Sequence, residues 1–147
     1  MTALYLVACV GQKRDDPAPA RDLYRSDWFL KARAYVEATG QPWYILSAAH
    51  GLVAPDRRLA PYDIALRDLP AADRRTWGAR TARQLARRLD GRRAETIVFL
   101  AGRLYRDPLL TIAGERAMVP MAGMGIGQQK AWLAARTPAR PRDPRSD

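Results

Sequence analysis

Residues 4–10, Leu-Tyr-Leu-Val-Ala-Cys-Val, form the stretch that decides the fold. Its apolar residues do not alternate with charged ones. Continuous apolar runs are typical of strands buried on both faces, as in a parallel sheet. Similar runs follow at 43–47, 96–101 and 117–121. We therefore predict four strands, Leu4–Val10, Trp43–Ser47, Thr96–Ala101 and Ala117–Met121, that form a mainly parallel sheet.

Helical patterns lie between these runs. Ser26 can cap a helix that ends at Gly40, and a second helix is predicted over Pro70–Asp90. A short helix is predicted to start at Asp107–Pro108, since proline fits a first helical turn, and a last helix near Gly127. Strands that alternate with helices predict a three-layer α/β/α fold with a four-stranded, mainly parallel sheet.

The length of 147 residues fits one domain, which we place at residues 1–137. Residues 138–147 are rich in Pro, Arg and Asp, so we expect a disordered tail. No apolar run is long enough for a membrane span, and the N-terminus lacks the features of a signal peptide. The one cysteine, Cys9, excludes an internal disulfide bond. These features lead us to expect a cytoplasmic protein without membrane partners.

The charge balance points to a polyanionic partner. Lys and Arg together number 25 against 15 Asp and Glu, which gives a formal net charge of +10. A GC-rich genome would explain arginine in place of lysine, but not the excess of base over acid. Such a balance is typical of nucleic-acid-binding proteins. We favour nucleic acid, DNA before RNA, over a free phosphorylated metabolite or no polyanion.

Ligands of parallel α/β sheets bind beyond the carboxyl ends of the strands, and the first such segment is residues 11–24. Gly11 permits a tight turn, and Gln12 can bond to a base edge. Asp15 or Asp16 can orient a water molecule. A solvated, charged turn explains the same residues. The binding candidates here also include Arg21, for phosphate, and Tyr24.

The second segment follows the strand at 43–47 and contains His50, the one histidine in the chain. A histidine can act as acid, base or hydrogen-bond donor near neutral pH, although many are structural. Ser47 can bind phosphate or cap a turn. Further along, Tyr62 can stack on a base or pack at the rim, and Asp63 can act as a general base or pair with an arginine.

The third and fourth segments carry candidates for phosphate and base binding. Arg103 can clamp phosphate and Tyr105 can stack on a base, or both can belong to an ordinary helix start. A glycine-rich loop precedes the last helix and can expose backbone amides to an anion. Its spacing matches neither a dinucleotide fingerprint nor a Walker loop. Its candidates are Gly123, Gly125, Gly127 and Gln128.

We expect no metal and no cofactor. One cysteine and one histidine cannot form an ordinary zinc site, and Cys9 falls within a buried strand, where an inert thiol is expected.

Several of these segments together resemble a known family. Residues 6–24, 43–51, 61–63, 101–109 and 123–129 resemble a family of small bacterial and phage proteins, most without an assigned function. That family is distantly similar to the peroxide-stress YaaA proteins and to a domain of archaeosine synthase.

A weaker likeness links the chain to the uracil-DNA glycosylase superfamily. Gly11-Gln12 resembles the loop after the first strand of those enzymes, in which an acid positions the attacking water. In this chain the acid, Asp15 or Asp16, comes later than in that pattern. The superfamily histidine lies near the C-terminus, whereas His50 follows the second predicted strand. This resemblance implies base excision.

The leading functional hypothesis is therefore a metal-independent N-glycosidase that excises a base, modified bases included, from DNA, with a role in repair or phage defence. Asp15, Asp16 or Asp63 would serve the water or the sugar cation, and His50 the leaving base. Two alternatives stay open: a non-catalytic nucleic-acid-binding protein, and a nucleotide N-glycoside hydrolase. The oligomeric state is not indicated by the sequence.

Overall fold

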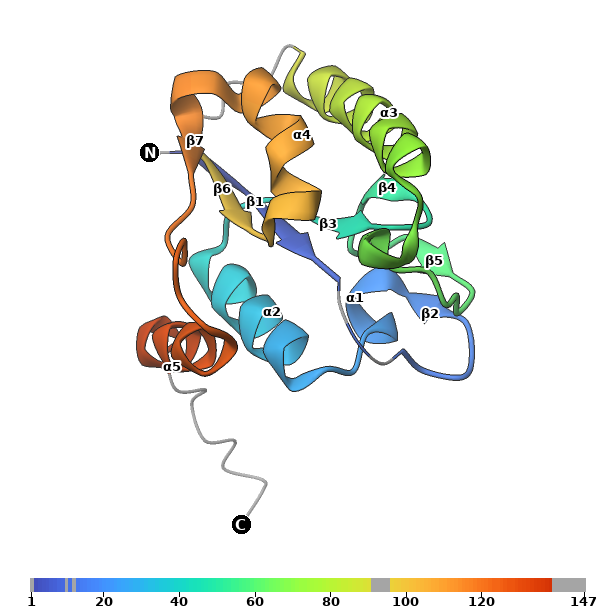
Figure 1. Cartoon of the computed structure of the whole chain (residues 1–147). Helices are drawn as coiled ribbons and strands as arrows, with labels where there is room; N and C mark the ends of the chain where they lie inside the picture. The colour runs from blue at the N-terminus through green and yellow to red at the C-terminus, as the bar shows by residue number, and fades with distance from the viewer. Residues whose placement is uncertain (1, 10, 12, 91–95, 139–147) are drawn as a thin grey trace.

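The computed structural model describes residues 2–9, 11, 13–90 and 96–138. Within these residues the chain forms a mixed α/β fold with a five-stranded sheet and five α-helices (Figure 1). The sheet consists of β1 (Ala3–Ala8), β3 (Trp43–Ser47), β4 (Gly51–Val53), β6 (Thr96–Leu100) and β7 (Ala117–Met118). The helices are α1 (Ala20–Leu23), α2 (Asp27–Thr39), α3 (Ala71–Leu89), α4 (Arg103–Ala113) and α5 (Ile126–Arg136).

Strand β1 lies in the middle of the sheet, whose order is β4-β3-β1-β6-β7. It pairs in parallel with β3 on one side and with β6 on the other, and β7 adds in parallel to β6. Strand β4 pairs antiparallel with β3, so the sheet is mixed. The prediction of a four-stranded sheet was wrong in the number of strands, because β4 adds a fifth strand. A strand of three residues that begins with Gly51 has no apolar run from which to predict it.

A second, two-stranded sheet pairs β2 (Ala18–Pro19) antiparallel with β5 (Arg58–Leu59). It holds the loop after β1 against the loop after β4. Both strands are too short to leave a periodic pattern in the sequence.

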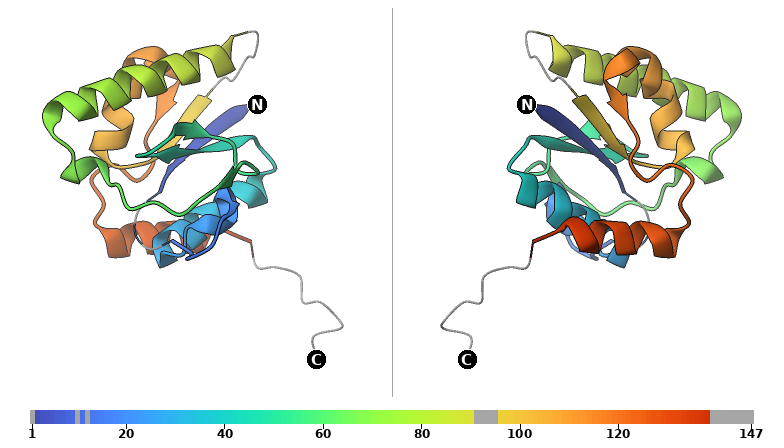
Figure 2. Two further views of the ribbon diagram at one scale, coloured as in Figure 1. Left: turned by 90° about the vertical axis from the view of Figure 1, so that its right-hand side faces the viewer. Right: turned by 90° about the vertical axis from the view of Figure 1, so that its left-hand side faces the viewer.

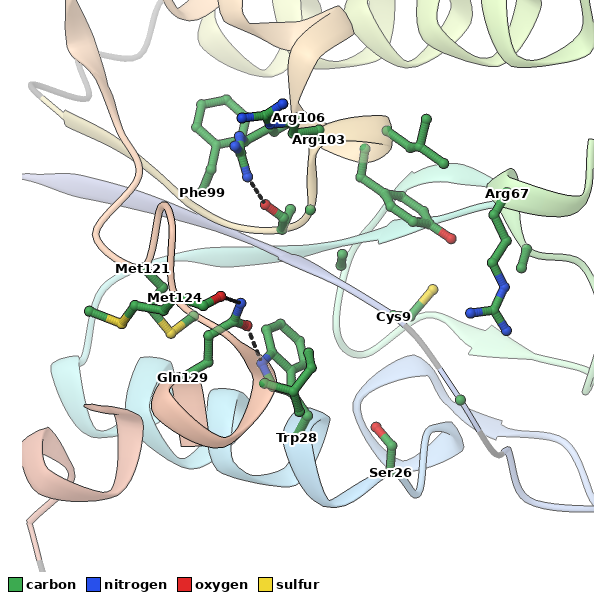
Figure 3. A pocket seen from close by; sticks show the side chains of 18 of the residues that line it. Cys9, Ser26, Trp28, Arg67, Phe99, Arg103, Arg106, Met121, Met124 and Gln129 are labelled. Atoms are coloured by element: carbon green, nitrogen blue, oxygen red, sulfur yellow. Dashed lines mark hydrogen bonds between the residues drawn. The ribbon is translucent and has the colours of Figure 1, made fainter. Parts of the chain in front are cut away.

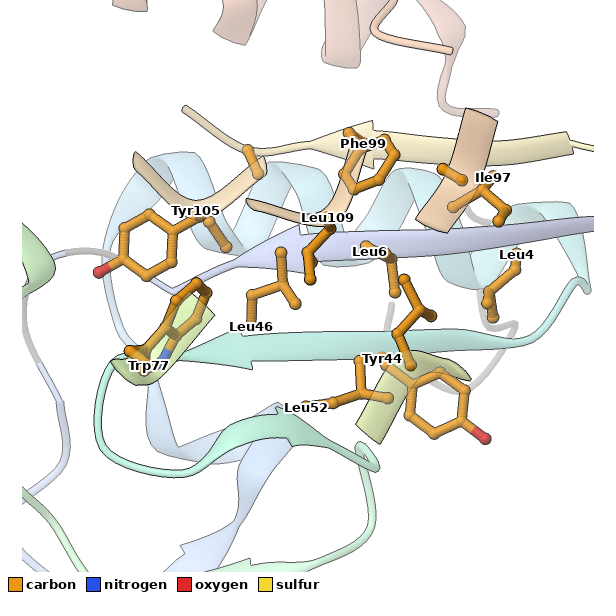
Figure 4. Close-up of a cluster of buried hydrophobic side chains, with 14 of the residues drawn as sticks. Leu4, Leu6, Tyr44, Leu46, Leu52, Trp77, Ile97, Phe99, Tyr105 and Leu109 are labelled. Atoms are coloured by element: carbon orange, nitrogen blue, oxygen red, sulfur yellow. The ribbon is translucent and has the colours of Figure 1, made fainter. Parts of the chain in front are cut away.

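The apolar runs are continuous because each strand is buried on both faces. Leu6 and Ala8 of β1 pack into one hydrophobic cluster, while Val7 and Cys9 pack into another. Successive side chains of a strand point to opposite faces, so one strand supplies both clusters. Figure 4 shows the first cluster, in which Leu4 and Leu6 lie with Leu46, Ile97 and Phe99.

Helices cover both faces of the sheet. Figure 2 shows α3 and α4 on one side and α2 and α5 on the other. Trp77 and Leu85 of α3 and Leu109 of α4 belong to the first cluster, and Phe29 of α2 and Leu133 of α5 to the second.

The predicted ends of α2 and α3 are confirmed. The hydroxyl of Ser26 accepts a hydrogen bond from the amide of Phe29, and Gly40 ends α2 in the left-handed conformation with a φ of 70°. Helix α3 is flanked by Pro70 and Asp90, as predicted. Helix α4 begins at Arg103, earlier than the predicted start at Asp107–Pro108, and Pro108 lies inside it. The proline alone was therefore a misleading start signal.

Within the described residues, no helix is both long and apolar enough to span a membrane. The predicted tail at 138–147 lies outside these residues except for Pro138, so its disorder stays a prediction.

Candidate functional site

A cleft of about 1300 Å³ opens at the carboxyl ends of β1 and β6. These two strands are neighbours in the sheet, but the chain visits β3 on the far side of β1 between them. The order of the strands therefore reverses here, and such a switch point is where open α/β sheets bind their ligands. Figure 3 shows side chains from several elements around the cleft.

Three helices begin at this cleft. Helix α2 starts at Ser26 and Asp27, α4 at Gly102 and Arg103, and α5 at Gly125 and Ile126. The first amides of a helix have no partner within the helix, and the helix dipole adds positive potential there. Three such ends around one cleft favour a ligand that carries negative charge.

The charged side chains at the cleft are mostly basic. They are Lys13, Arg67, Arg103, Arg106 and Lys130, against the carboxylates of Asp27, Asp63 and Asp68. Asp27 is already engaged: its carboxylate accepts from Lys31 at 2.8 Å and pairs with Lys130 at 3.2 Å, contacts that hold its pKa below the usual value. Asp68 lies 4.0 Å from Arg67. Asp63 is exposed and forms no ion pair with any described residue.

One side of the cleft is apolar. Trp28 and Met121 are buried there, beside Met124 (Figure 3). The indole Nε1 of Trp28 donates to Oε1 of Gln129 at 2.8 Å, and Nε2 of Gln129 donates to the carbonyl of Met124 at 2.9 Å. This chain of hydrogen bonds joins the starts of α2 and α5 and holds the indole at the cleft.

A buried polar cluster lies behind the cleft, centred on the hydroxyl of Tyr62. That hydroxyl is 2.7 Å from the hydroxyl of Tyr24, 2.6 Å from Oγ of Ser47 and 3.3 Å from Sγ of Cys9. The ammonium group of Lys13 lies 4.5 Å from the centre of the Tyr62 ring. Burial, and then the nearby Cys9, raise the pKa of both tyrosines, so both phenols stay neutral near physiological pH.

The cleft brings together several residues that the sequence singled out. They come from the first, third and fourth segments and, for Asp63, from the stretch that follows the second segment; the structure places them around one hollow. The predicted residues that line the cleft are Gly11, Asp63, Arg103, Tyr105, Gly123 and Gly125.

Three predicted residues lie in the buried polar cluster: Tyr24, Ser47 and Tyr62. Tyr24 and Ser47 are almost fully buried and contact the cleft only through their neighbours. Tyr62 does not line the cleft; its hydroxyl is bonded and Lys13 lies over its ring, so its stacking on a base stays a prediction. Tyr105 lines the cleft, but its ring packs edge-on against Trp77 at 5.5 Å.

Other predicted residues lie elsewhere. Asp15 and Asp16 are exposed on the loop after β1 and do not line the cleft. Arg21 lies 3.9 Å from Asp22. Gln128 accepts from the amide of Gly125 at 3.0 Å, so it serves the start of α5. Gly127 is in the same turn and is not part of the lining, and Gln12 lies outside the described residues.

His50 lies in the turn between β3 and β4, in contact with Tyr62. Its ring packs edge-on against that of Tyr62 at 5.5 Å, and it is not among the residues that line the cleft. Partial burial, and then the charges of Arg57 and Arg80, lower the pKa of His50. Its surroundings thus favour the neutral imidazole.

A family model matches residues 4–135, nearly the whole described chain. The chain belongs to the family of unknown function DUF6884. No curated protein and no solved structure matches the sequence. The likeness to the YaaA proteins, to archaeosine synthase and to the uracil-DNA glycosylases is therefore not shown by these comparisons.

Several cleft residues escaped the sequence analysis. From the sequence, Trp28 was expected only as part of the helix capped by Ser26, and Met121 as part of a strand. A signal was available for Trp28: it lies two residues after the cap Ser26, at the start of the first long helix after β1, where a ligand-facing position is expected. Within the described residues, no group of three or more His, Cys, Asp or Glu side chains is arranged to hold a metal ion.

The variant Tyr62→Phe tests the buried polar cluster. Removal of the hydroxyl leaves Tyr24 and Ser47 with one partner fewer in a buried site, so we expect the free energy of unfolding to fall by about 1–3 kcal/mol. Urea unfolding measures this. Tyr44→Phe is the matched control, since the Tyr44 hydroxyl forms no hydrogen bond among the described residues, and its effect should stay within about 0.5 kcal/mol. Equal effects would contradict the cluster's role.

The lowered pKa of His50 predicts a loss of stability in mild acid. The unfolded chain binds the proton first as the pH falls through the ordinary histidine value of about 6.5, so stability falls from there until the folded pKa is passed. His50→Gln should remove this part of the pH dependence, as measured by urea unfolding at pH 7.5 and pH 5. An unchanged difference between the two pH values in the variant would contradict the assignment.

Proposed function

We propose that the cleft binds one nucleotide of a nucleic acid and hydrolyses its N-glycosidic bond. The observation that carries this proposal is the union, in one cleft, of an apolar aromatic wall with three helix N-termini and five basic side chains. A nucleotide has the matching parts: a flat base with little charge and an anionic phosphate.

The two halves of the cleft suggest how the nucleotide lies. The base would pack against Trp28, Met121 and Met124, where an apolar surface is available. The phosphate would lie near Arg103 and Arg106 at the start of α4, where backbone amides and guanidinium groups can donate. The net charge of +10 supports a polymer as the source of that nucleotide, since it favours polyanions. A base of a duplex would have to leave the stack to enter the cleft.

The reaction requires a water molecule, a general base that accepts its proton, and a group that stabilises the leaving nucleobase. Water attacks C1′ of the sugar, and the bond from C1′ to the base nitrogen breaks with its electron pair on the base. Asp63 is the carboxylate of the cleft with no ion pair among the described residues, so it is free to orient the water and accept its proton. Its charge also stabilises the cationic character that develops on the sugar.

Lys13 is suited to stabilise the leaving base. Its ammonium group lies over Tyr62 at the wall of the cleft, where it can donate to a base that gains negative charge. From the sequence, His50 was expected in this role. Because His50 does not line the cleft, we assign the role to Lys13 instead.

Base release is the direct test. The purified protein is incubated with DNA that carries natural and modified bases, with RNA and with free nucleotides, and liberated base is measured by mass spectrometry. We expect base release from polymer, and Asp63→Asn should lower the rate by about 10²–10⁴-fold with binding retained. The double variant Asp15→Asn/Asp16→Asn is the control and should keep the rate, because these exposed carboxylates do not line the cleft.

Other results would change the conclusion in defined ways. Release from free nucleotides alone would make the protein a nucleotide hydrolase. Binding without release from any substrate would contradict the catalytic step and leave a binding protein. A rate that depends on Asp15 or Asp16 and not on Asp63 would contradict the role given to Asp63.

A further inference from the structure

A second, shallower hollow of about 470 Å³ adjoins the cleft between the N-terminal halves of α3 and α4. Arg103 and Leu104 line both the cleft and this groove. The two hollows are thus separated by the first residues of α4. We call the second hollow the α3–α4 groove; it is lined by Ala71, Arg74, Arg75, Gly78, Ala79, Ala82, Arg103, Leu104, Asp107 and Pro108.

The shape of the groove follows from small residues on α3. At Gly78 the two helices touch: a Cβ atom there would come within 2.8 Å of Cβ of Pro108. Ala79 and Ala82 continue this face of α3 with short side chains. Because these side chains fill little space, the helices meet at the base of the groove and leave its upper part open.

The groove is basic. Arg74, Arg75 and Arg103 line it, against the single carboxylate of Asp107. Nη1 of Arg74 donates to the carbonyl of Leu69 at 2.6 Å, which holds this guanidinium in place. Arg75 is exposed, and among the described residues it forms no ion pair. The groove therefore offers guanidinium donors that no neighbouring carboxylate occupies.

We propose that the α3–α4 groove binds the sugar and phosphate of the nucleotide next to the one in the cleft, so that one strand of the nucleic acid runs from the cleft into the groove. This inference rests on the proposed binding of a nucleotide in the cleft. Adjacent nucleotides share one phosphate, and Arg103 lies on the wall that the two hollows share, where that phosphate would be. Arg74 and Arg75 would then contact the next phosphate along the strand.

The other arginines of α3 have a different setting. Arg83 and Arg87 are exposed but line neither hollow, and Arg80 donates to the carbonyl of Ala49. Arg83 lies on the same helix and carries the same charge as Arg75. It therefore provides a matched control that separates a contact in the groove from a general effect of charge.

The test compares ligands of increasing length on the full chain. Binding of a deoxynucleoside 5′-monophosphate and of single-stranded tetra- and octanucleotides is measured by calorimetry at several salt concentrations. We expect the wild-type protein to bind the tetranucleotide at least ten-fold more tightly than the monophosphate. Arg75→Glu should weaken tetranucleotide binding by about ten-fold or more and change monophosphate binding by less than about two-fold. It should also reduce the salt dependence of oligonucleotide binding, because fewer counterions are released.

The control variant separates a contact in the groove from a general effect of charge. Arg83→Glu should weaken tetranucleotide binding far less than Arg75→Glu. Equal weakening by the two variants would overturn the groove as the path of the strand. Equal wild-type affinity for monophosphate and tetranucleotide would also overturn it, while leaving nucleotide binding in the cleft intact. If the wild-type protein binds none of these ligands, the proposed function and the groove both fail.

Discussion

The parallel pairing of β1 with β3 on one side and with β6 on the other is the constraint on which the rest of the structure depends. Leu6 and Val7 of β1 are fully buried, one on each face of the sheet. Helices must therefore cover both faces, and they do so in pairs, α3 with α4 and α2 with α5 (Figure 2). Because the chain passes from β3 across β1 to β6, the segments after β1 and β6 leave toward opposite faces. The cleft lies between them.

The chemistry of the cleft follows from this arrangement. Helices that follow neighbouring parallel strands begin at the same edge of the sheet, so the starts of α2, α4 and α5 gather there. These helix starts bind anions through backbone amides and the helix dipole, so they require no particular side chains for it. The specific side chains then divide the cleft: Trp28 and the methionines supply an apolar wall, and the basic residues supply the anion-binding side. Trp28 keeps its place through Gln129, which ties α2 to α5.

Much of the fold could be predicted because burial leaves a direct pattern in the sequence. The strands β1, β3 and β6 appear as uninterrupted apolar runs, and the ends of α2 carry a serine cap and a glycine stop. Strand β4 has three residues and depends on pairing with β3, a contact that no local pattern encodes. No local pattern encodes the position of Tyr62 either, because its hydroxyl lies within hydrogen-bonding distance of side chains from three other segments. The sequence therefore indicated which segments lie at the carboxyl ends of the strands, while the positions of Asp15, Asp16 and His50 outside the lining of the cleft required the structure.

The most direct test of the central claim, that the switch-point cleft binds a nucleotide, is a titration followed by NMR. Uniformly ¹⁵N-labelled protein is titrated with a deoxynucleoside 5′-monophosphate while backbone amide and indole signals are recorded. We expect the largest shifts at the amides of residues 102–106 and 123–126 and at the indole of Trp28, with little change in the second half of α3. Shifts concentrated on α3, or no saturable shifts at the cleft, would contradict the assignment of this cleft as the nucleotide site.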